Sequence, residues 1–437
     1  MEATAPAAPP PRVARSGALL LAGTLSANIL AYTFFIILSR YLPAGSLGAV
    51  GALVNLSAIA TVPALGLQLV AARRVARFSV GHSGVDASPT GAASPSASST
   101  EDTACILRTG LEVGAVTALV IVCATPLLGR ILQVDAVSMV LLAAGLVPMA
   151  ATYALQGVLQ GGERFGPLAL MVAVSGAAKP MAAVVTAATG GSVSTVMLCL
   201  ALGWTLTAGL GLLLTRPGRL WGNAVSRDHV RRDVVAASVP TSGLLLLSSL
   251  DVLLARHHLT PAESGSYTVG ALFEKAALWG MAFLATLFYP AMARPLERTT
   301  ATAKALTITA GLGFTGTALT WAASQGVVRI AGGPDYAGLA PDAWRFTALG
   351  SLLALVQVIV YASLARARVR AGVAVWLAGL VAIVSAHVWG DSVRGIVTVM
   401  LVTTSALVAV LLFLEFARSR PAVPSARRRA RSDQLPH

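Results

Sequence analysis

Twelve apolar runs of bilayer-spanning length fill most of this 437-residue sequence. A helix needs about 20 apolar residues to cross the hydrocarbon layer, so twelve crossings use about 240 residues. Only 11% of the residues are charged, against about 25% in soluble domains, so most of the surface cannot face water. The spans are predicted at residues 17–38, 47–70, 113–129, 136–158, 167–189, 192–214, 234–254, 267–289, 305–328, 344–364, 371–389 and 396–416.

Basic residues are distributed unevenly across this topology. Of the 32 Lys and Arg residues, 24 lie in segments on the side of the N-terminus, six in the opposite loops or at the adjoining ends of spans, and two deep within spans. The positive-inside rule then predicts a multi-pass protein of the cell membrane with both termini in the cytoplasm. The same bias explains the formal net charge of +14, because basic residues of the cytoplasmic loops bind to anionic lipid. No nucleic-acid partner is therefore expected.

The chain contains a duplication near its midpoint. LSRYLPAGSLGAVGAL at 38–53 aligns with LARHHLTPAESGSYTVGAL at 254–272, which pairs Arg40 with Arg256 and ends in the same VGAL. Both copies follow the first helix of a six-helix set, so we predict an all-α protein with about 12 transmembrane helices in two pseudo-symmetric six-helix bundles. Such halves place a cavity at their interface and work by alternating access, which favours a transporter over a bundle without transport.

The predicted domains follow from this division. They are a cytoplasmic N-terminal tail at 1–16, an N-terminal bundle at 17–216 with a disordered cytoplasmic loop at 78–104, a cytoplasmic linker at 217–233, a C-terminal bundle at 234–416 and a basic cytoplasmic tail at 417–437. The loop is rich in Ser, Ala, Gly and Pro and has no hydrophobic period, which is typical of disorder.

Several ionisable residues lie within the predicted spans, where they are costly and usually face the bundle interior or a wet cavity. Lys179 is near the middle of the fifth span, and Glu274 and Lys275 are in the eighth. Asp251, near the outer end of the seventh span, aligns with Phe35 of the first half and so has no acidic counterpart. The alternatives to a functional role are snorkelling to an interface and structural ion pairs.

No catalytic or metal-binding motif accompanies these groups. The sequence has no HExxH, no GxxxxGK[ST] loop and no Gly-rich dinucleotide turn, and the three cysteines show no ligand spacing. The six histidines are not expected to form a ligand set, and the adjacent His257 and His258 are interpreted as interfacial. We expect no enzyme and no bound cofactor. The energy source is expected to be an ion gradient, of protons or sodium, the membrane potential or the gradient of the substrate itself.

Several strings in the sequence resemble a known family. Four strings are similar to polysaccharide flippases of the O-antigen type. They are SRYLPAGSLGAVGAL after the first helix, LQGVLQGGERFG at 155–166, DVLLARHHLTPAESGSYTVGALFEK at 251–275 and GGPDYAGLA at 332–340. These flippases are part of the multidrug/oligosaccharidyl-lipid/polysaccharide exporter superfamily. The resemblance covers nearly the whole chain and implies a V-shaped pair of six-helix bundles. Their central cavity would carry the sugar-pyrophosphate head of a polyprenyl-linked oligosaccharide to the outer leaflet for cell-envelope polysaccharide biosynthesis.

The implied partners are the lipid-linked glycan, membrane lipids, and glycosyltransferases or a polymerase of the same pathway. A pyrophosphate cannot cross hydrocarbon without cations along its path. The substrate-binding candidates are Arg40, Lys179, Arg256, Lys275, Asn28 and Gln156, and the ion-coupling candidates are Asp251 and Glu274. The last two substrate candidates are uncharged, and their alternative role is hydrogen bonding between helices.

Two other functions stay open. A drug/cation antiporter of the same superfamily has the same fold and should prefer acidic cavity residues. A membrane glycosyltransferase or ligase should carry long outward loops, whereas all outward loops predicted here are short.

Overall fold

The structure is a computed structural model that describes residues 29–81, 95–217, 225–366 and 370–416. Within these ranges the regular elements are helices, and no strand occurs. Nine helical segments there are long and apolar enough to cross a membrane, and a shorter apolar helix at Ile29–Tyr41 precedes them. Helices α8 and α10, with 34 and 25 residues, are also long enough to cross, which agrees with an expected total of about twelve. The prediction of an all-α, multi-pass membrane protein is confirmed.

Each half of the chain contributes one group of helices. The N-terminal half contains α2 (Ala44–Ala60), α3 (Val62–Gly81), α4 (Pro95–Leu132), α5 (Ala136–Gly161), α6 (Phe165–Thr189) and α7 (Val193–Thr215). The C-terminal half contains α8 (Val225–His258), α9 (Pro261–Ala293), α10 (Arg298–Ala322), α11 (Ser324–Ala331), the 3-10 helix η1 (Pro334–Asp342), α12 (Ala343–Leu364), α13 (Arg370–Trp389) and α14 (Val393–Phe416). The expected tails at 1–16 and 417–437, and Asn28, lie outside the described residues.

Helices α2 and α3 form one membrane crossing with a break at Thr61. Pro63 causes the break because it has no N–H to donate to the carbonyl of Ile59. Thr61 lies at the break, and its Oγ1 donates to the carbonyl of Ser57 at 2.6 Å. The predicted second span is therefore one crossing made of two helices.

The third span is longer than the sequence predicted. It runs from Thr103 to Leu132 in α4, whereas hydropathy placed its start at 113 because Arg108 and Glu112 interrupt the apolar run. In the fold these charges are paired: Glu112 lies 3.3 Å from Arg108 and 2.7 Å from Arg231 of α8. Part of the expected disordered loop at 78–104 is helical, because α3 extends to Gly81 and α4 begins at Pro95, and residues 82–94 lie outside the described residues.

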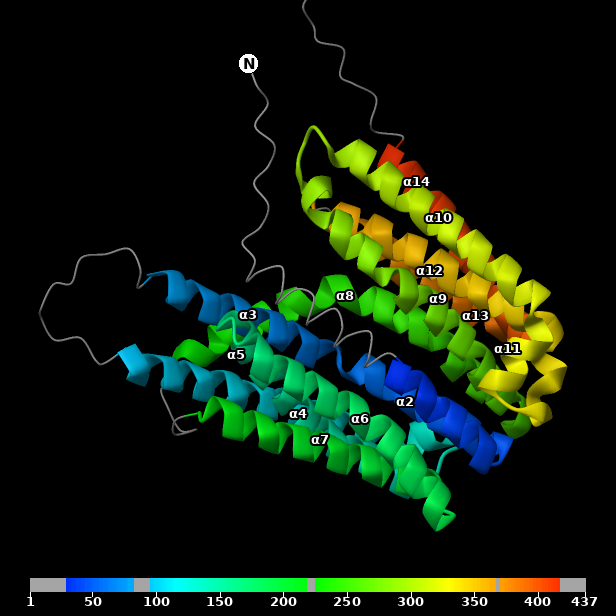
Figure 1. Cartoon of the computed structure of the whole chain (residues 1–437), viewed down its shortest axis with the longest axis horizontal. Helices are drawn as coiled ribbons and strands as arrows, with labels where there is room; N and C mark the ends of the chain where they lie inside the picture. Colours follow the sequence, from blue (N-terminus) through cyan, green and yellow to red (C-terminus); the bar gives the residue numbers. More distant parts are fainter. Residues whose placement is uncertain (1–28, 82–94, 218–224, 367–369, 417–437) are drawn as a thin grey trace, which may run out of the picture.

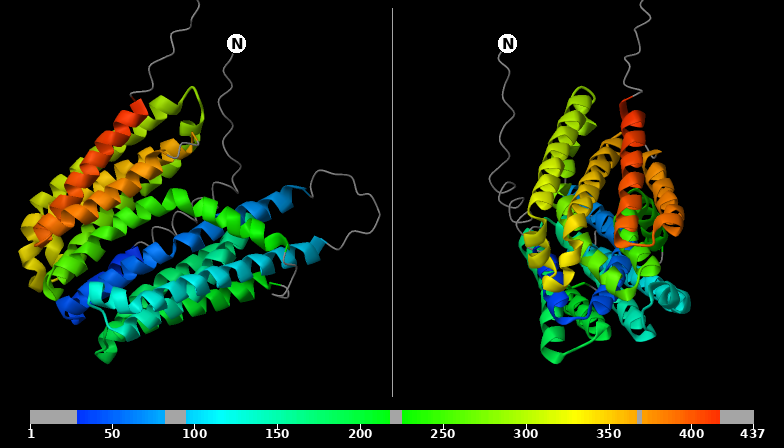
Figure 2. Two further views of the ribbon diagram at one scale, coloured as in Figure 1. Left: turned by 180° about the vertical axis from the view of Figure 1, so that it is seen from behind. Right: turned by 90° about the vertical axis from the view of Figure 1, so that its right-hand side faces the viewer.

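The two groups of helices form a V (Figure 1). Helices α2–α7 make one arm and α9–α14 the other, and α8 runs between them, packing against α3 of the first arm and α13 of the second. The back view shows the same divergence of the arms (Figure 2). We call the end where the arms meet the joined end; it carries the turns at 42–43, 133–135 and 259–260. The opposite end, with the turns at 162–164 and 294–297, is the open end.

Small residues bring the two arms into contact at the joined end. The start of α2 packs against the start of α9, and these are the two copies of the predicted repeat. A Cβ added at Gly265 would overlap the carbonyl of Ala44, and one added at Gly48 would overlap the side chain of Ser264. Glycine is required at both positions because the backbones approach so closely, as in small-residue helix interfaces in membranes.

Candidate functional site

A buried cluster of three charged residues joins α8 to α9. Lys275 Nζ lies 2.9 Å from Glu274 Oε1 and 3.6 Å from Asp251 Oδ1, and it also donates to the carbonyl of Ser248. Both carboxylates are fully buried, with 0% of their surface exposed. Helix packing thus brings the two predicted coupling acids, distant in the sequence, around one lysine. Lys275, predicted to bind substrate, is paired with both acids in this conformation, and its role toward substrate stays a prediction.

The cluster has more acid than base. Its two carboxylates face one ammonium group, and both oxygens of Asp251 and Oε2 of Glu274 have no hydrogen-bond partner. The hydroxyl of Tyr267, fully buried on α9, interacts with Asp251 and Glu274 and can donate a hydrogen bond to Asp251. Buried polar groups normally have partners, and ionised groups in a membrane are costly. The arrangement therefore has spare acceptor oxygens that a proton or a small cation would satisfy.

Lys179 lies on the interior face of α6, near the middle of the helix. The residues that share its helix face are buried: Gly176 three positions before it, and Ala183 and Thr186 four and seven positions after it. Met181, on a different face, is 58% exposed. Residues at these spacings share a helix face, so Lys179 points toward the bundle rather than toward lipid. Among the described residues it makes no ion pair or hydrogen bond, which leaves it a half-buried cation without a partner.

Arg256 fastens the two arms together at the joined end. It is 4% exposed at the end of α8, and its guanidinium donates to the carbonyls of Leu132 and Gln133 at 2.8 Å each and of Gly45 at 3.1 Å. All three acceptors are in the N-terminal half. Gln133 has a φ of 49°, a left-handed conformation that is strained for a non-glycine residue and that this contact holds.

Arg40, the repeat counterpart of Arg256, makes the reciprocal contact. Its Nη2 donates to the carbonyls of Arg329 and Ile330 at 3.1 and 2.9 Å, near the end of α11 in the C-terminal half. The neighbouring Ser39 donates to the carbonyl of Ala331 at 3.2 Å. Each arginine therefore caps a helix C-terminus of the opposite half, which supports the alignment of the two repeats.

These contacts change the interpretation of both arginines. We predicted Arg40 and Arg256 as substrate-binding cations, and here their guanidinium groups are bonded to backbone carbonyls across the two halves. Helix C-terminal carbonyls attract cations, and charged hydrogen bonds are stronger than neutral ones. In this conformation the two arginines hold the two halves together at the joined end, and we call this pair of contacts the clamp. Of the four predicted cations, only Lys179 is without a partner among the described residues.

Asp135 organises the loop beside this clamp. It caps α5 by accepting from the backbone N–H and hydroxyl of Ser138 at 2.8 Å each, and the hydroxyl of Ser194 on α7 lies at 3.3 Å. Partial burial acts to raise the pKa of Asp135, but these hydrogen bonds outweigh it and lower the pKa below its usual value. The carboxylate therefore stays ionised and fixes the start of α5.

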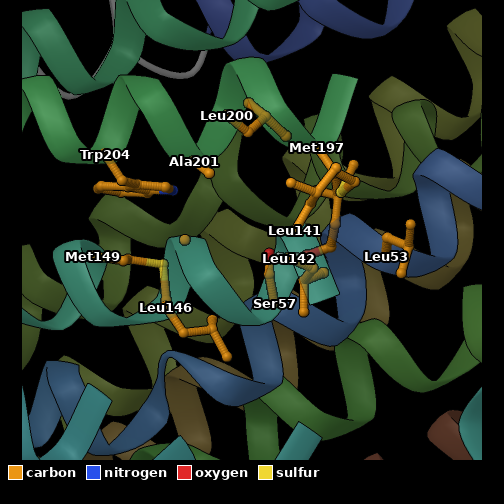
Figure 3. Close-up of a pocket in the computed structure, with 12 residues that line it drawn as sticks. Leu53, Ser57, Leu141, Leu142, Leu146, Met149, Met197, Leu200, Ala201 and Trp204 are labelled. Atoms are coloured by element: carbon orange, nitrogen blue, oxygen red, sulfur yellow. Dashed lines mark hydrogen bonds between the residues drawn. The ribbon is translucent and has the colours of Figure 1, made fainter. Parts of the chain in front are cut away.

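The N-terminal arm also contains an apolar pocket between α2, α5 and α7 (Figure 3). Trp204 of α7 and Met149 of α5 line it, with Ser57 of α2 as one of few polar contributors. No charged residue lines the pocket, so it suits an alkyl or aromatic group rather than a phosphate. Gln156, predicted to contact substrate, lies further along α5, is 6% exposed and has no hydrogen-bond partner among the described residues.

Three histidines meet at the joined end, contrary to the sequence interpretation. His387 of α13 lies beside His257 and His258 of α8, with ring centroids 4.7 Å apart for His258 and His387. Burial, followed by the nearness of the other two rings, lowers the pKa of His258, while Asp391 acts to raise it. The sequence could not indicate this cluster because α13 meets α8 only through the tertiary fold.

Comparison with known proteins shows the fold. An inward-facing multidrug resistance MATE family transporter of the MOP superfamily is similar at a TM-score of 0.71 and 13% identity, over 90% of this chain and 94% of that chain. The lipid II flippase MurJ in an inward closed conformation is similar at a TM-score of 0.72 and 10% identity, over 91% of this chain and 87% of that chain. An outward-facing MATE family transporter is similar at a TM-score of 0.55 and 14% identity, over 91% of this chain and 95% of that chain. No protein-family model matches the sequence, and no curated protein matches it.

These structures are those of transporters and a flippase, not of enzymes. At such low identity the likeness concerns the fold, and the chain has the fold of MOP superfamily transporters.

Proposed function

We propose that this chain is an alternating-access transporter that flips a polyprenyl-pyrophosphate-linked oligosaccharide from the cytoplasmic to the outer leaflet of the cell membrane. The observation that carries the proposal is Lys179, a cation without a partner among the described residues, on the interior face of an apolar helix. Such a residue costs about 2.5–3.5 kcal/mol at the centre of a bilayer, so a structural explanation needs a compensating partner. A pyrophosphate passing between the arms supplies that partner.

The arrangement of the arms agrees with entry from the cytoplasm. The loops of the open end belong to the side that holds most of the basic residues, which the positive-inside rule assigns to the cytoplasm. The similarity score is also higher to the inward-facing MATE structure than to the outward-facing one, at 0.71 against 0.55. A lipid-linked substrate would place its head between the arms and leave its tail in the bilayer.

The acid cluster supplies a means of coupling. Asp251 and Glu274 share one lysine, so one proton or one sodium ion would complete the charge balance of the cluster. Because Asp251 is on α8 and Glu274 is on α9, binding of a cation would change the packing between these helices. Helix α8 contacts both arms, so such a change would reach the interface between them.

A drug/cation antiporter is the second candidate, and the same cluster favours it. A surplus of buried carboxylates suits a cationic substrate, and a MATE family transporter is among the similar structures. The two functions differ in the charge of the substrate and therefore make opposite demands on Lys179. A cationic drug would be repelled by Lys179, whereas a pyrophosphate requires it.

Depletion of the protein in its native cell tests the proposal directly. We expect lipid extracts of depleted cells to contain an accumulated polyprenyl-linked glycan, and a membrane-impermeant glycan-modifying reagent to leave it intact in sealed, right-side-out vesicles. Restoring the wild-type gene should remove the accumulation. Retention of cationic dyes in depleted cells, with unchanged lipid-linked glycans, would support the antiporter instead.

Asp251→Asn is expected to remove the dependence of transport on an ion gradient. A pH difference of one unit is worth about 1.36 kcal/mol per proton, so a coupled wild-type protein in vesicles should respond by about tenfold. The variant should transport at the same rate with and without the gradient, because its amide cannot bind the proton. Glu297→Gln, an exposed acid in the same half, is the matched control and should behave as wild type. A gradient response equal to wild type in Asp251→Asn would remove Asp251 from the coupling mechanism.

A further inference from the structure

The histidine cluster at the joined end has the geometry of a metal site. One ring nitrogen from each of His257, His258 and His387 lies within 4.8 Å of the other two. A tetrahedral ion with bonds of about 2.0–2.1 Å holds pairs of ligands about 3.3 Å apart, so small rotations of the rings bring all three nitrogens into range. Two helices, α8 and α13, supply the ligands, which gives the set a fixed framework.

Hydrogen bonds already set the ring tautomers for metal binding. Nδ1 of His257 lies 3.2 Å from the carbonyl of Ile131, and Nδ1 of His387 lies 3.3 Å from the carbonyl of Ile383. A carbonyl can only accept, so each Nδ1 carries the proton and each Nε2 keeps its lone pair. Metal-binding histidines in proteins are held in the same way by a backbone carbonyl.

His258 provides an independent observation. Its Nε2 is buried and has no hydrogen-bond partner, although buried polar atoms are normally satisfied. An ion bound to the three rings would satisfy this nitrogen. Asp391, just beyond α13, acts electrostatically on His258 and adds negative charge that favours a cation.

We propose that His257, His258 and His387 form a binding site for a divalent transition-metal ion of the Zn²⁺ class. Imidazole nitrogen suits zinc, copper and nickel, whereas magnesium and calcium require oxygen ligands. Three histidines leave a fourth position for water. The ion fastens α8 to α13, and because His257 also contacts Ile131 of the N-terminal half, it braces the joined end of the two arms.

Cobalt titration tests the site without any assumption about transport. The full-length protein is purified in detergent through a tag that contains no histidine, and Co²⁺ is added while visible absorption is recorded. Co²⁺ absorbs more strongly in a four-coordinate nitrogen site than in water. We expect about one Co²⁺ per chain, displaced by Zn²⁺ and not by Mg²⁺.

Variants identify the ligands. His387→Gln and His258→Gln should weaken Co²⁺ binding at least tenfold. Loss of a group that only hydrogen-bonds to a metal ligand already costs about tenfold or more, and loss of the ligand itself should cost no less. His229→Gln, near the opposite end of α8, is the matched control and should bind as wild type. His387 is exposed, so its replacement should leave the fold intact even if His258→Gln does not. Equal Co²⁺ binding by wild type and His387→Gln would overturn the proposal.

Discussion

Lys179→Ala is expected to abolish transport of the lipid-linked glycan while leaving the amount of protein in the membrane unchanged. Removing one member of a buried charge pair costs about 3–5 kcal/mol, which corresponds to a reduction of about 10²–10⁴-fold in the rate of substrate passage. Folding should not suffer, because the lysine has no partner among the described residues and an alanine suits an apolar helix. Surface polysaccharide in cells and flipping in vesicles are the two measurements.

Two further variants make this result specific. Lys179→Arg keeps the charge and should retain a substantial part of the activity. Lys304→Ala removes an exposed lysine of α10 and should have no effect. Full polysaccharide levels in Lys179→Ala would exclude the residue from the substrate path. Faster efflux of a cationic drug in the same variant would favour the antiporter, because the repulsive charge is gone.

The number of crossings and the interior position of Lys179 could be predicted from sequence because both follow from local patterns. A run of about 20 apolar residues and a 3.6-residue period are visible without the fold. The start of α4 could not be predicted, because the charge of Glu112 is neutralised by Arg231 of a distant helix. Hydropathy counts such a pair as two charges and ends the span too early.

The repeat is recognisable from residues, but the backbone contacts of its arginines are not. The alignment of Arg40 with Arg256 established that they are equivalent, and a cation near a membrane interface then suggested substrate binding. Their actual acceptors are backbone carbonyls at the ends of α4 and α11. A backbone carbonyl is present at every residue, so no sequence pattern distinguishes the ones that an arginine will reach. The histidine cluster was missed for a related reason, because His387 is far from His257 and His258 along the chain.

Arg256→Ala is expected to open the joined end of the two arms. The guanidinium makes charged hydrogen bonds to three carbonyls of the opposite half, and such bonds contribute about 1.5–3 kcal/mol each. Losing the equivalent of two of them, about 3 kcal/mol, shifts the equilibrium between joined and separated states more than about 100-fold. Spin labels at Arg130 and Asp335, exposed positions of the two halves at this end, should report a longer distance in the variant. The labels require a background in which the three cysteines are replaced.

The reciprocal residue makes the clamp testable even if Arg256→Ala folds poorly. Arg40→Ala removes two carbonyl contacts at an exposed position and should shift the same distance distribution in the same direction. The effect on the equilibrium between joined and separated states should be smaller, about tenfold, as expected for the loss of one charged hydrogen bond. Arg294→Ala is the matched control, because Arg294 is exposed at the open end and bonds only to Glu297 of its own half. If neither clamp variant lengthens the distance, the joined end is held by the close contact of α2 with α9. The two repeat-related arginines would then serve only to cap α4 and α11.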